Sequence, residues 1–317
     1  MTSACRMNLQ WVLVVTSAMF GPACSGEVGD SPEGTDTRTS SALTASTPAF
    51  DCERHQDTDE ATTSTTGSTG QVEVSDFFIG ATFYADSTIV RGRAQPECVA
   101  HIQSPDQAFS DVGTLVVGSD FVGMPGGPAN PFAIEPDFRN DYFAFPDPPL
   151  FNVGRGERVQ VSLAGLPAFP PIHVATLRSS ALAPIHVMAP TVPASEVLAV
   201  SSTAPLRFGW EVPASPSPHV GRQRHPESVS MCLFALGPAH WGQLYCSWST
   251  SAGRGEVPAS LLSEFRRQLG GSGVLDASVD IYSGGFREFA TPRSSYVVIA
   301  TTDFATTFPR STAATFE

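Results

Sequence analysis

Hydrophobic and polar residues alternate with a period of two along most of the chain from Gln71 onward. Every second residue is apolar in three clear runs: Val159, Val161, Leu163; Leu206, Phe208, Trp210; and Leu275, Ala277, Val279, Ile281. Successive side chains of a β-strand point to opposite faces, so this pattern predicts strands with one buried face, as in antiparallel sheets. Clusters of Gly and Pro separate the runs. The sequence therefore predicts an all-β fold made of β-sandwiches.

One segment follows a helical period instead. Its apolar residues lie on one face of an α-helix: Leu261, Leu262, Phe265 and Leu269. Pro258 stands near the start, and Gly270 and Gly271 follow the last turn, as is typical of helix ends. The pattern predicts one short crossover helix over residues 258–269.

The strands are expected to form two domains, a first sandwich over residues 71–194 and a second over residues 195–317. Trp210 lies close in sequence to Cys232 and Cys246, which resembles the Trp that packs on a disulfide in immunoglobulin domains. Here Trp210 precedes both cysteines, so the order differs. We expect two immunoglobulin-like sandwiches with the helix in the second.

Residues 1–23 have the features of a signal peptide. Arg6 precedes an apolar stretch of ten residues, WVLVVTSAMF, which is too short to span a bilayer. Ala23-Cys24 follows, as in a bacterial lipobox, which predicts lipidation of Cys24. Ser25 after the Cys then favours the outer membrane, with the protein facing either the periplasm or the cell surface. The alternative is ordinary cleavage after Ala23, which gives a secreted soluble protein.

Residues 24–70 are predicted to be a disordered tether. Nine acidic residues and two Arg lie among many Ser and Thr in this segment, and Leu43 and Phe50 are its only large apolar side chains downstream of Cys24. Such a composition cannot bury enough apolar surface to fold. We interpret it as a solvated spacer between the lipid and the first domain.

Four cysteines remain after Cys5 in the signal peptide and Cys24 at the lipidation site: Cys52, Cys98, Cys232 and Cys246. An even number in an exported chain predicts two disulfides, for which three connectivities are possible. Cys232 and Cys246 lie in adjacent strand-like runs. We expect a local Cys232–Cys246 bridge, which leaves Cys52 to pair with Cys98.

Composition excludes several kinds of chemistry. All 18 basic residues are Arg, so mechanisms that need a lysine are ruled out. The net charge of −13 argues against nucleic acid as a partner, because such binding requires a basic face. The sequence contains no metalloprotease motif, no Cys-x-x-Cys pair and no nucleophile elbow. We expect no catalytic residue and no resident cofactor.

The best candidate for a ligand surface is the loop over residues 130–151. It combines several aromatic rings with a set of polar residues: Glu135, Asp137, Asp141, Tyr142 and Asp147. Carboxylate oxygens are ligands for Ca²⁺, and aromatic rings stack on sugars, so the loop suggests a calcium or glycan site. The alternative is a connection whose aromatics pack on the sandwich and whose acids face water.

Several short segments together resemble a family of uncharacterised exported lipoproteins from myxobacteria-like Gram-negative bacteria. They are the lipid Cys and tether, the strand Glu97-Cys-Val-Ala-His, the run Gly165-Leu-Pro-Ala-Phe-Pro, the Trp210 strand, and Gly255-Glu-Val-Pro-Ala-Ser-Leu-Leu. The resemblance implies the same architecture and localisation. It implies no activity and no catalytic residue.

These observations predict a lipid-anchored cell-surface protein with a binding or structural role. Its expected partners are the outer-membrane lipid and an unidentified protein or glycan. The alternative is a secreted carbohydrate-active protein, either a glycan-binding module or a hydrolase, or a calcium-dependent adhesin that uses the 130–151 loop.

Overall fold

A computed structural model describes residues 62–75, 78–92, 95–119, 132–145, 158–166, 169–177, 185–190, 197–212, 228–301 and 312–317. The predicted signal peptide, Cys24, Cys52 and Asp147 lie outside these residues. The described part is built mainly of β-strands, which confirms the all-β prediction.

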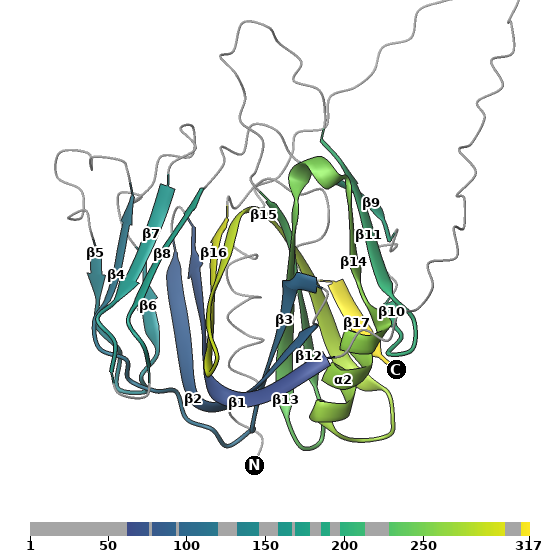
Figure 1. The fold of residues 1–317 in the computed structure, drawn as a ribbon, viewed down its shortest axis with the longest axis horizontal. Helices are drawn as coiled ribbons and strands as arrows, with labels where there is room; N and C mark the ends of the chain where they lie inside the picture. The colour runs from purple at the N-terminus through teal and green to yellow at the C-terminus, as the bar shows by residue number, and fades with distance from the viewer. Residues whose placement is uncertain are drawn as a thin grey trace, which may run out of the picture. The chain divides into compact units, whose positions relative to one another are not determined.

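A ten-stranded sheet forms the centre of the fold (Figure 1). Its strands are β1 (Thr62–Val74), β2 (Ile79–Gly92), β3 (Gln95–Gln103), β6 (Tyr142–Ala144), β10 (Leu198–Val200), β12 (Ser228–Leu236), β13 (Trp241–Ser249), β15 (Leu275–Thr291), β16 (Ser294–Thr301) and β17 (Thr312–Phe316).

The central sheet closes on itself. The first half of β15 pairs with β12, and the second half, from Gly284 onward, pairs with β16. The path β15–β12–β13–β3–β2–β1–β16 therefore returns to β15 and makes a closed ring of seven strands. All its junctions are antiparallel except that between β1 and β16, which is parallel.

Two smaller sheets cover the outer face of the ring in sandwich-like layers. One contains β4 (Leu115–Ser119), β5 (Phe132–Ile134), β7 (Arg158–Leu163) and β8 (Ile172–Leu177). The other contains β9 (His186–Ala189), β11 (Leu206–Glu211) and β14 (Arg254–Val257). A core that includes Phe83, Val161 and Tyr296 joins the first to the ring, and a core that includes Ile102, Phe208 and Leu244 joins the second.

The predicted helix is confirmed as α2 (Ala259–Leu269), which follows the short 3-10 helix η1 (Thr250–Ala252) and β14. Leu261, Leu262, Phe265 and Leu269 are buried in the same core as Phe208 and Leu244. The apolar face predicted from the sequence is therefore the face of α2 that packs into the core.

Arg266 supports the C-terminal end of α2. The buried Arg266 guanidinium donates hydrogen bonds to the carbonyl oxygens of Gly270, Gly271 and Gly273. These carbonyls belong to the turn that follows the helix, so the arginine fixes that turn against the last turn of α2.

The strand pairing crosses the boundary predicted at residues 194 and 195. In the ring, β3 pairs with β13 and β1 pairs with β16, so strands from the two predicted domains alternate in one sheet. Both cores likewise mix residues from before and after that point. The period-two pattern identified the strands but carried no information about which distant strands pair.

The predicted tether is too long at its C-terminal end. β1 begins at Thr62, and residues 62–67 pair with residues 87–92 of β2. The Thr-rich composition was interpreted as solvated spacer, yet β-branched Thr also fits a strand whose neighbour supplies the hydrogen bonds.

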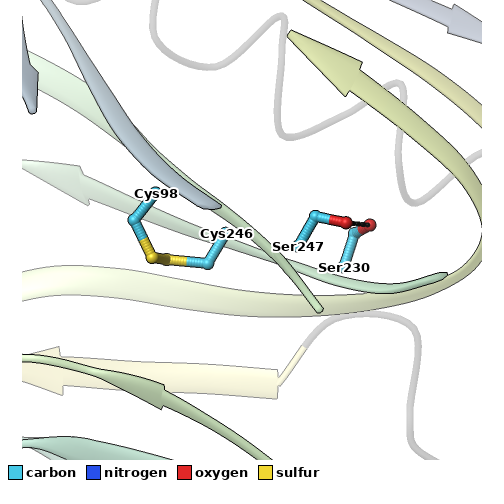
Figure 2. The surroundings of a disulfide bond; sticks show 4 residues. All are labelled: Cys98, Ser230, Cys246 and Ser247. Atoms are coloured by element: carbon cyan, nitrogen blue, oxygen red, sulfur yellow. Dashed lines mark hydrogen bonds between the residues drawn. A yellow bond between two sulfur atoms is a disulfide. The ribbon is translucent and has the colours of Figure 1, made fainter. Parts of the chain in front are cut away.

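The expected disulfide connectivity is wrong. Cys98 of β3 and Cys246 of β13 form the disulfide, with Cα atoms 4.1 Å apart and a sequence separation of 148 (Figure 2). Cys232 is buried and forms no disulfide with any described cysteine. It lies opposite Tyr245 on the neighbouring strand, so its side chain points to the other face of the sheet from Cys246.

Candidate functional site

The loop between β5 and β6 is organised by Asp137. One carboxylate oxygen of Asp137 accepts hydrogen bonds from the backbone N–H groups of Arg139 and Asp141, at 2.7 and 2.9 Å. The backbone of Asp137 also bonds to Asp141 and Asn140, and Asn140 has a φ of 61°, in the left-handed region that Asn tolerates. The Asp137 carboxylate therefore holds the turn.

Tyr142 anchors this loop to the segment before β4. Its side chain is fully buried, and its hydroxyl accepts a hydrogen bond from the N–H of Val112 at 2.9 Å and donates one to the carbonyl of Gly113 at 2.8 Å. Burial raises the pKa of the phenol to about 12. Tyr142 is thus a buried residue that fixes the loop to residues 112 and 113, and it does not face solvent.

Glu135 and Asp141 are the other predicted acids of the loop that the structure describes. Glu135 accepts a hydrogen bond from the hydroxyl of Thr114 at 2.6 Å. Burial, and then the neighbouring carboxylate of Asp137, raise the pKa of Asp141 above its ordinary value. The structure thus brings Asp137 and Asp141 close together within the candidate loop.

Three phenylalanines of the loop reach the surface. Phe138 is 88% exposed, Phe143 50% and Phe145 55%, and the rings of Phe143 and Phe145 lie 6.5 Å apart. The Arg139 guanidinium lies 5.0 Å from the centre of the Phe138 ring. We call the residues 135–145 with these exposed rings the aromatic loop.

A polar chain that the sequence did not reveal lies among the strands of the ring. Arg91 forms an ion pair with Glu288 at 2.8 Å, and the same oxygen of Glu288 accepts a hydrogen bond from the Ser295 hydroxyl at 2.6 Å. The Ser295 oxygen in turn lies 2.7 Å from Nε2 of His101. Four strands, β2, β3, β15 and β16, thus contribute to one continuous chain.

The Ser295–His101 contact has the length expected of a nucleophile and its base, but its setting is that of a structural hydrogen bond. Ser295 is 0% exposed and His101 is 2% exposed. The carboxylate of Glu288 binds the serine, whereas a catalytic triad needs the acid on the histidine. Burial, and then the positive charge of Arg91, lower the pKa of His101 to about 3, so the imidazole stays neutral.

A second polar group surrounds Tyr245. Its hydroxyl donates a hydrogen bond to Gln71 Oε1 at 2.6 Å, and Nε2 of Gln243 donates to the same oxygen at 3.2 Å. Burial raises the pKa of Tyr245 and of the Cys232 thiol well above their ordinary values, and the carboxylates of Glu73 and Asp280 raise both further.

An aromatic cluster adjoins this group. Tyr84 packs against Phe109 at 5.3 Å and against Trp241 at 5.6 Å, and Trp241 packs against Phe234 at 5.9 Å. The side-chain amide of Asn140 donates to the carbonyl of Phe109 at 3.0 Å, which ties the aromatic loop to the cluster. We name Tyr84, Phe109, Phe234 and Trp241 the aromatic cluster.

The sequence pattern did not identify these groups. Val99 shares a face with His101, and Trp241 and Tyr245 share a face with Gln243, so polar and apolar residues are mixed on this face of the strands. In a closed ring, the second face of each strand also meets other strands, so these polar residues hydrogen-bond one another. Periodicity distinguishes two faces and does not say which one is solvated.

Two absences among the described residues are relevant to the site. Within residues 62–317 as far as they are described, no group of three His, Cys, Asp or Glu side chains could hold a metal ion. None of the helices in that part is long and apolar enough to cross a membrane.

The chain matches no protein-family model and no curated protein.

Proposed function

We propose that the protein is an exported envelope protein that is anchored to the outer membrane through an acylated Cys24 and binds a partner through the aromatic loop. The observation that carries the binding role is the exposure of Phe138, Phe143 and Phe145 on a loop whose backbone is fixed by Asp137 and Tyr142. Large exposed apolar patches mark interaction sites, and a rigid loop binds at a lower entropic cost.

Export is supported by the Cys98–Cys246 disulfide, because disulfides persist in oxidising compartments and are rare in the cytosol. The apolar segment ahead of Cys24 supports the same conclusion. Binding without catalysis is supported by the surroundings of the acids. Asp137 holds a turn, and Glu288 acts on a serine that is sealed within the fold.

A glycan-binding module is the second candidate. The observation that favours it is the exposed ring of Phe138 on a loop that also carries Glu135 and Asp137, since sugars bind through ring stacking and hydrogen bonds to carboxylates. A hydrolase would act on the same ligand but would release reducing sugar.

The test is cosedimentation of the Cys24→Ser protein with isolated outer envelopes. The wild-type loop should carry the protein into the pellet, and Phe138→Ser combined with Phe143→Ser should reduce the bound fraction at least fivefold. Val274→Ser, which removes another exposed apolar side chain, is the matched control and should bind normally. Equal binding of the loop variant would overturn the proposal, and release of reducing sugar would favour a hydrolase.

A further inference from the structure

The N-terminal part of β1 extends past the start of its neighbour β16 (Figure 1). β2 pairs with β1 from Thr62 to Val74, whereas β16 begins at Ser294 and pairs with β1 only from Ser68 onward. Within the part of the chain that the structure describes, residues 62–66 therefore have a strand neighbour on one side only. We call residues 62–66 the open edge.

The open edge presents backbone hydrogen-bonding groups on its unpaired side. The N–H of Ser68 donates to the carbonyl of Arg293 at 3.0 Å, so the peptide groups of Ser68 face the side of β16. Because these groups alternate between the two sides of a strand, those of Thr66, Ser64 and Thr62 face the same side as those of Ser68. The edge is thus a row of N–H and C=O groups with which a further strand can pair.

The open edge lacks the features that keep sheet edges apart. Its sequence is Thr-Thr-Ser-Thr-Thr, without a charged residue or a proline, and residues 63–66 are all exposed. Its register with β2 is regular, so no bulge within it twists the edge away. Proteins commonly protect an exposed edge with charges, prolines or bulges, because a bare edge pairs with other chains. This edge is therefore suited to a strand from outside the chain.

The sequence of the open edge indicates which strand fits it. Thr-Thr-Ser-Thr-Thr is the same in both directions, so two antiparallel copies place Ser64 opposite Ser64 and Thr62 opposite Thr66. The backbone groups of Ser64 face outward, so the centre of the symmetric sequence coincides with a hydrogen-bonded pair. Cross-strand Thr and Ser pairs stabilise antiparallel sheets, and a self-complementary patch gives a closed twofold dimer.

We propose that the protein forms a twofold dimer in which the open edges of two copies pair as antiparallel strands. A ladder of this length buries less surface than a typical stable interface, so the dimer is weak and depends on concentration. The interface involves no residue of the aromatic loop and goes beyond the proposed envelope-binding role. A dimer carries two aromatic loops, which raises its avidity for a surface that bears many ligands.

The experiment is sedimentation velocity of the full chain carrying Cys24→Ser over a hundredfold range of concentration. The average mass should rise towards that of a dimer. Ser64→Pro removes the outward N–H at the centre of the interface and keeps the pairing with β2, so it should weaken dimerisation at least tenfold. Ser64→Ala keeps that N–H and is the matched control, which should dimerise within twofold of wild type. Both variants lose the hydrogen bond from Gln268 to the Ser64 hydroxyl, so this bond does not distinguish them.

Cysteine substitution tests the register and does not depend on the proline variant. Ser64→Cys places two thiols opposite each other, with Cα atoms about 5.5 Å apart, which is within the range of a disulfide. Mild oxidation should therefore link the two copies. Thr63→Cys is the control, because Thr63 lies opposite Thr65 of the other copy and its own counterpart is too distant to bond.

Three results would overturn the dimer. They are a monomer at every concentration, dimerisation of a folded Ser64→Pro protein as strong as that of Ser64→Ala, or equal cross-linking at positions 63 and 64. Because the measurements use soluble protein without envelopes, they do not depend on anchoring or on the aromatic loop. Failure here leaves the cosedimentation test unaffected, and the reverse also holds.

Discussion

Cys232 and Cys246 lie on adjacent strands, yet their side chains point to opposite faces of the sheet. Cys232 packs with Val99, Tyr245 and Val297, whereas Cys246 belongs to the core on the other side of β13. The bridge closest in sequence is therefore sterically excluded, and Cys246 pairs instead with Cys98 of β3. This disulfide joins strands from the two halves of the chain.

The disulfide should contribute strongly to stability. It closes a loop of 148 residues, for which loss of chain entropy in the unfolded state predicts about 4–5 kcal/mol. Reductant should therefore lower the free energy of unfolding in guanidinium by about that amount. Cys232→Ala should keep the full effect of reductant, and the double variant Cys98→Ala, Cys246→Ala should lose it. A reductant effect that disappears with Cys232 would contradict the pairing.

The Cys232 thiol should resist alkylation in the native protein. It is buried, and burial raises its pKa, so both access and the reactive thiolate are suppressed. Iodoacetamide labelling, followed by mass spectrometry, should give unmodified Cys232 under native conditions and complete modification in guanidinium. Native labelling at the rate of a free cysteine would show that this position is open.

Tyr142→Phe should destabilise the protein by about 1–3 kcal/mol, because it leaves the N–H of Val112 and the carbonyl of Gly113 without their hydroxyl partner. Phe143→Leu, one residue along on the exposed face, should change the unfolding free energy by about 0.5 kcal/mol or less. Urea denaturation measures both. Equal effects of the two substitutions would show that Tyr142 does not anchor the loop.

His101 should make folding sensitive to acid. The pKa of His101 is about 3 in the folded protein, whereas an unfolded histidine titrates near its ordinary value of about 6.5. Between these values the unfolded state binds more protons, so stability is complete above about pH 6.5 and is lost as pH falls towards 3. The contribution is at most about 1.4 kcal/mol per pH unit.

The measurement is the slope of unfolding free energy against pH for wild type and for His101→Gln. The variant should have the shallower slope in this window, whatever its absolute stability. His173→Gln, which changes an exposed histidine of β8, should keep the wild-type slope. Parallel slopes for wild type and His101→Gln would contradict the assignment.

The period-two runs and the helical spacing of Leu261, Phe265 and Leu269 were enough to predict the strands and α2, because local burial sets those patterns. They could not predict that β1 pairs with β16 or β3 with β13. Those pairings join residues far apart in sequence, and a strand pattern contains no record of its neighbour. Strands from residues 71–194 and strands from residues 195–317 accordingly pair with one another in the central sheet.

The site shows the same limit. The composition of residues 130–151 identified the candidate loop, but the sequence left open whether its aromatic rings pack on the sheet or face solvent. Tyr84 and Trp241 come from strands separated by nearly half of the chain. Their contact depends on closure of the ring and could not be foreseen.

The protein isolated from the cell envelope should carry the acyl anchor and the disulfide together. Mass spectrometry of a non-reduced digest should show an N-terminal peptide that begins at acylated Cys24, a Cys98–Cys246 linked peptide, and Cys232 as a free thiol. A Cys232–Cys246 linked peptide would contradict the fold. An unacylated N-terminus at another residue would contradict the anchored envelope protein that we propose.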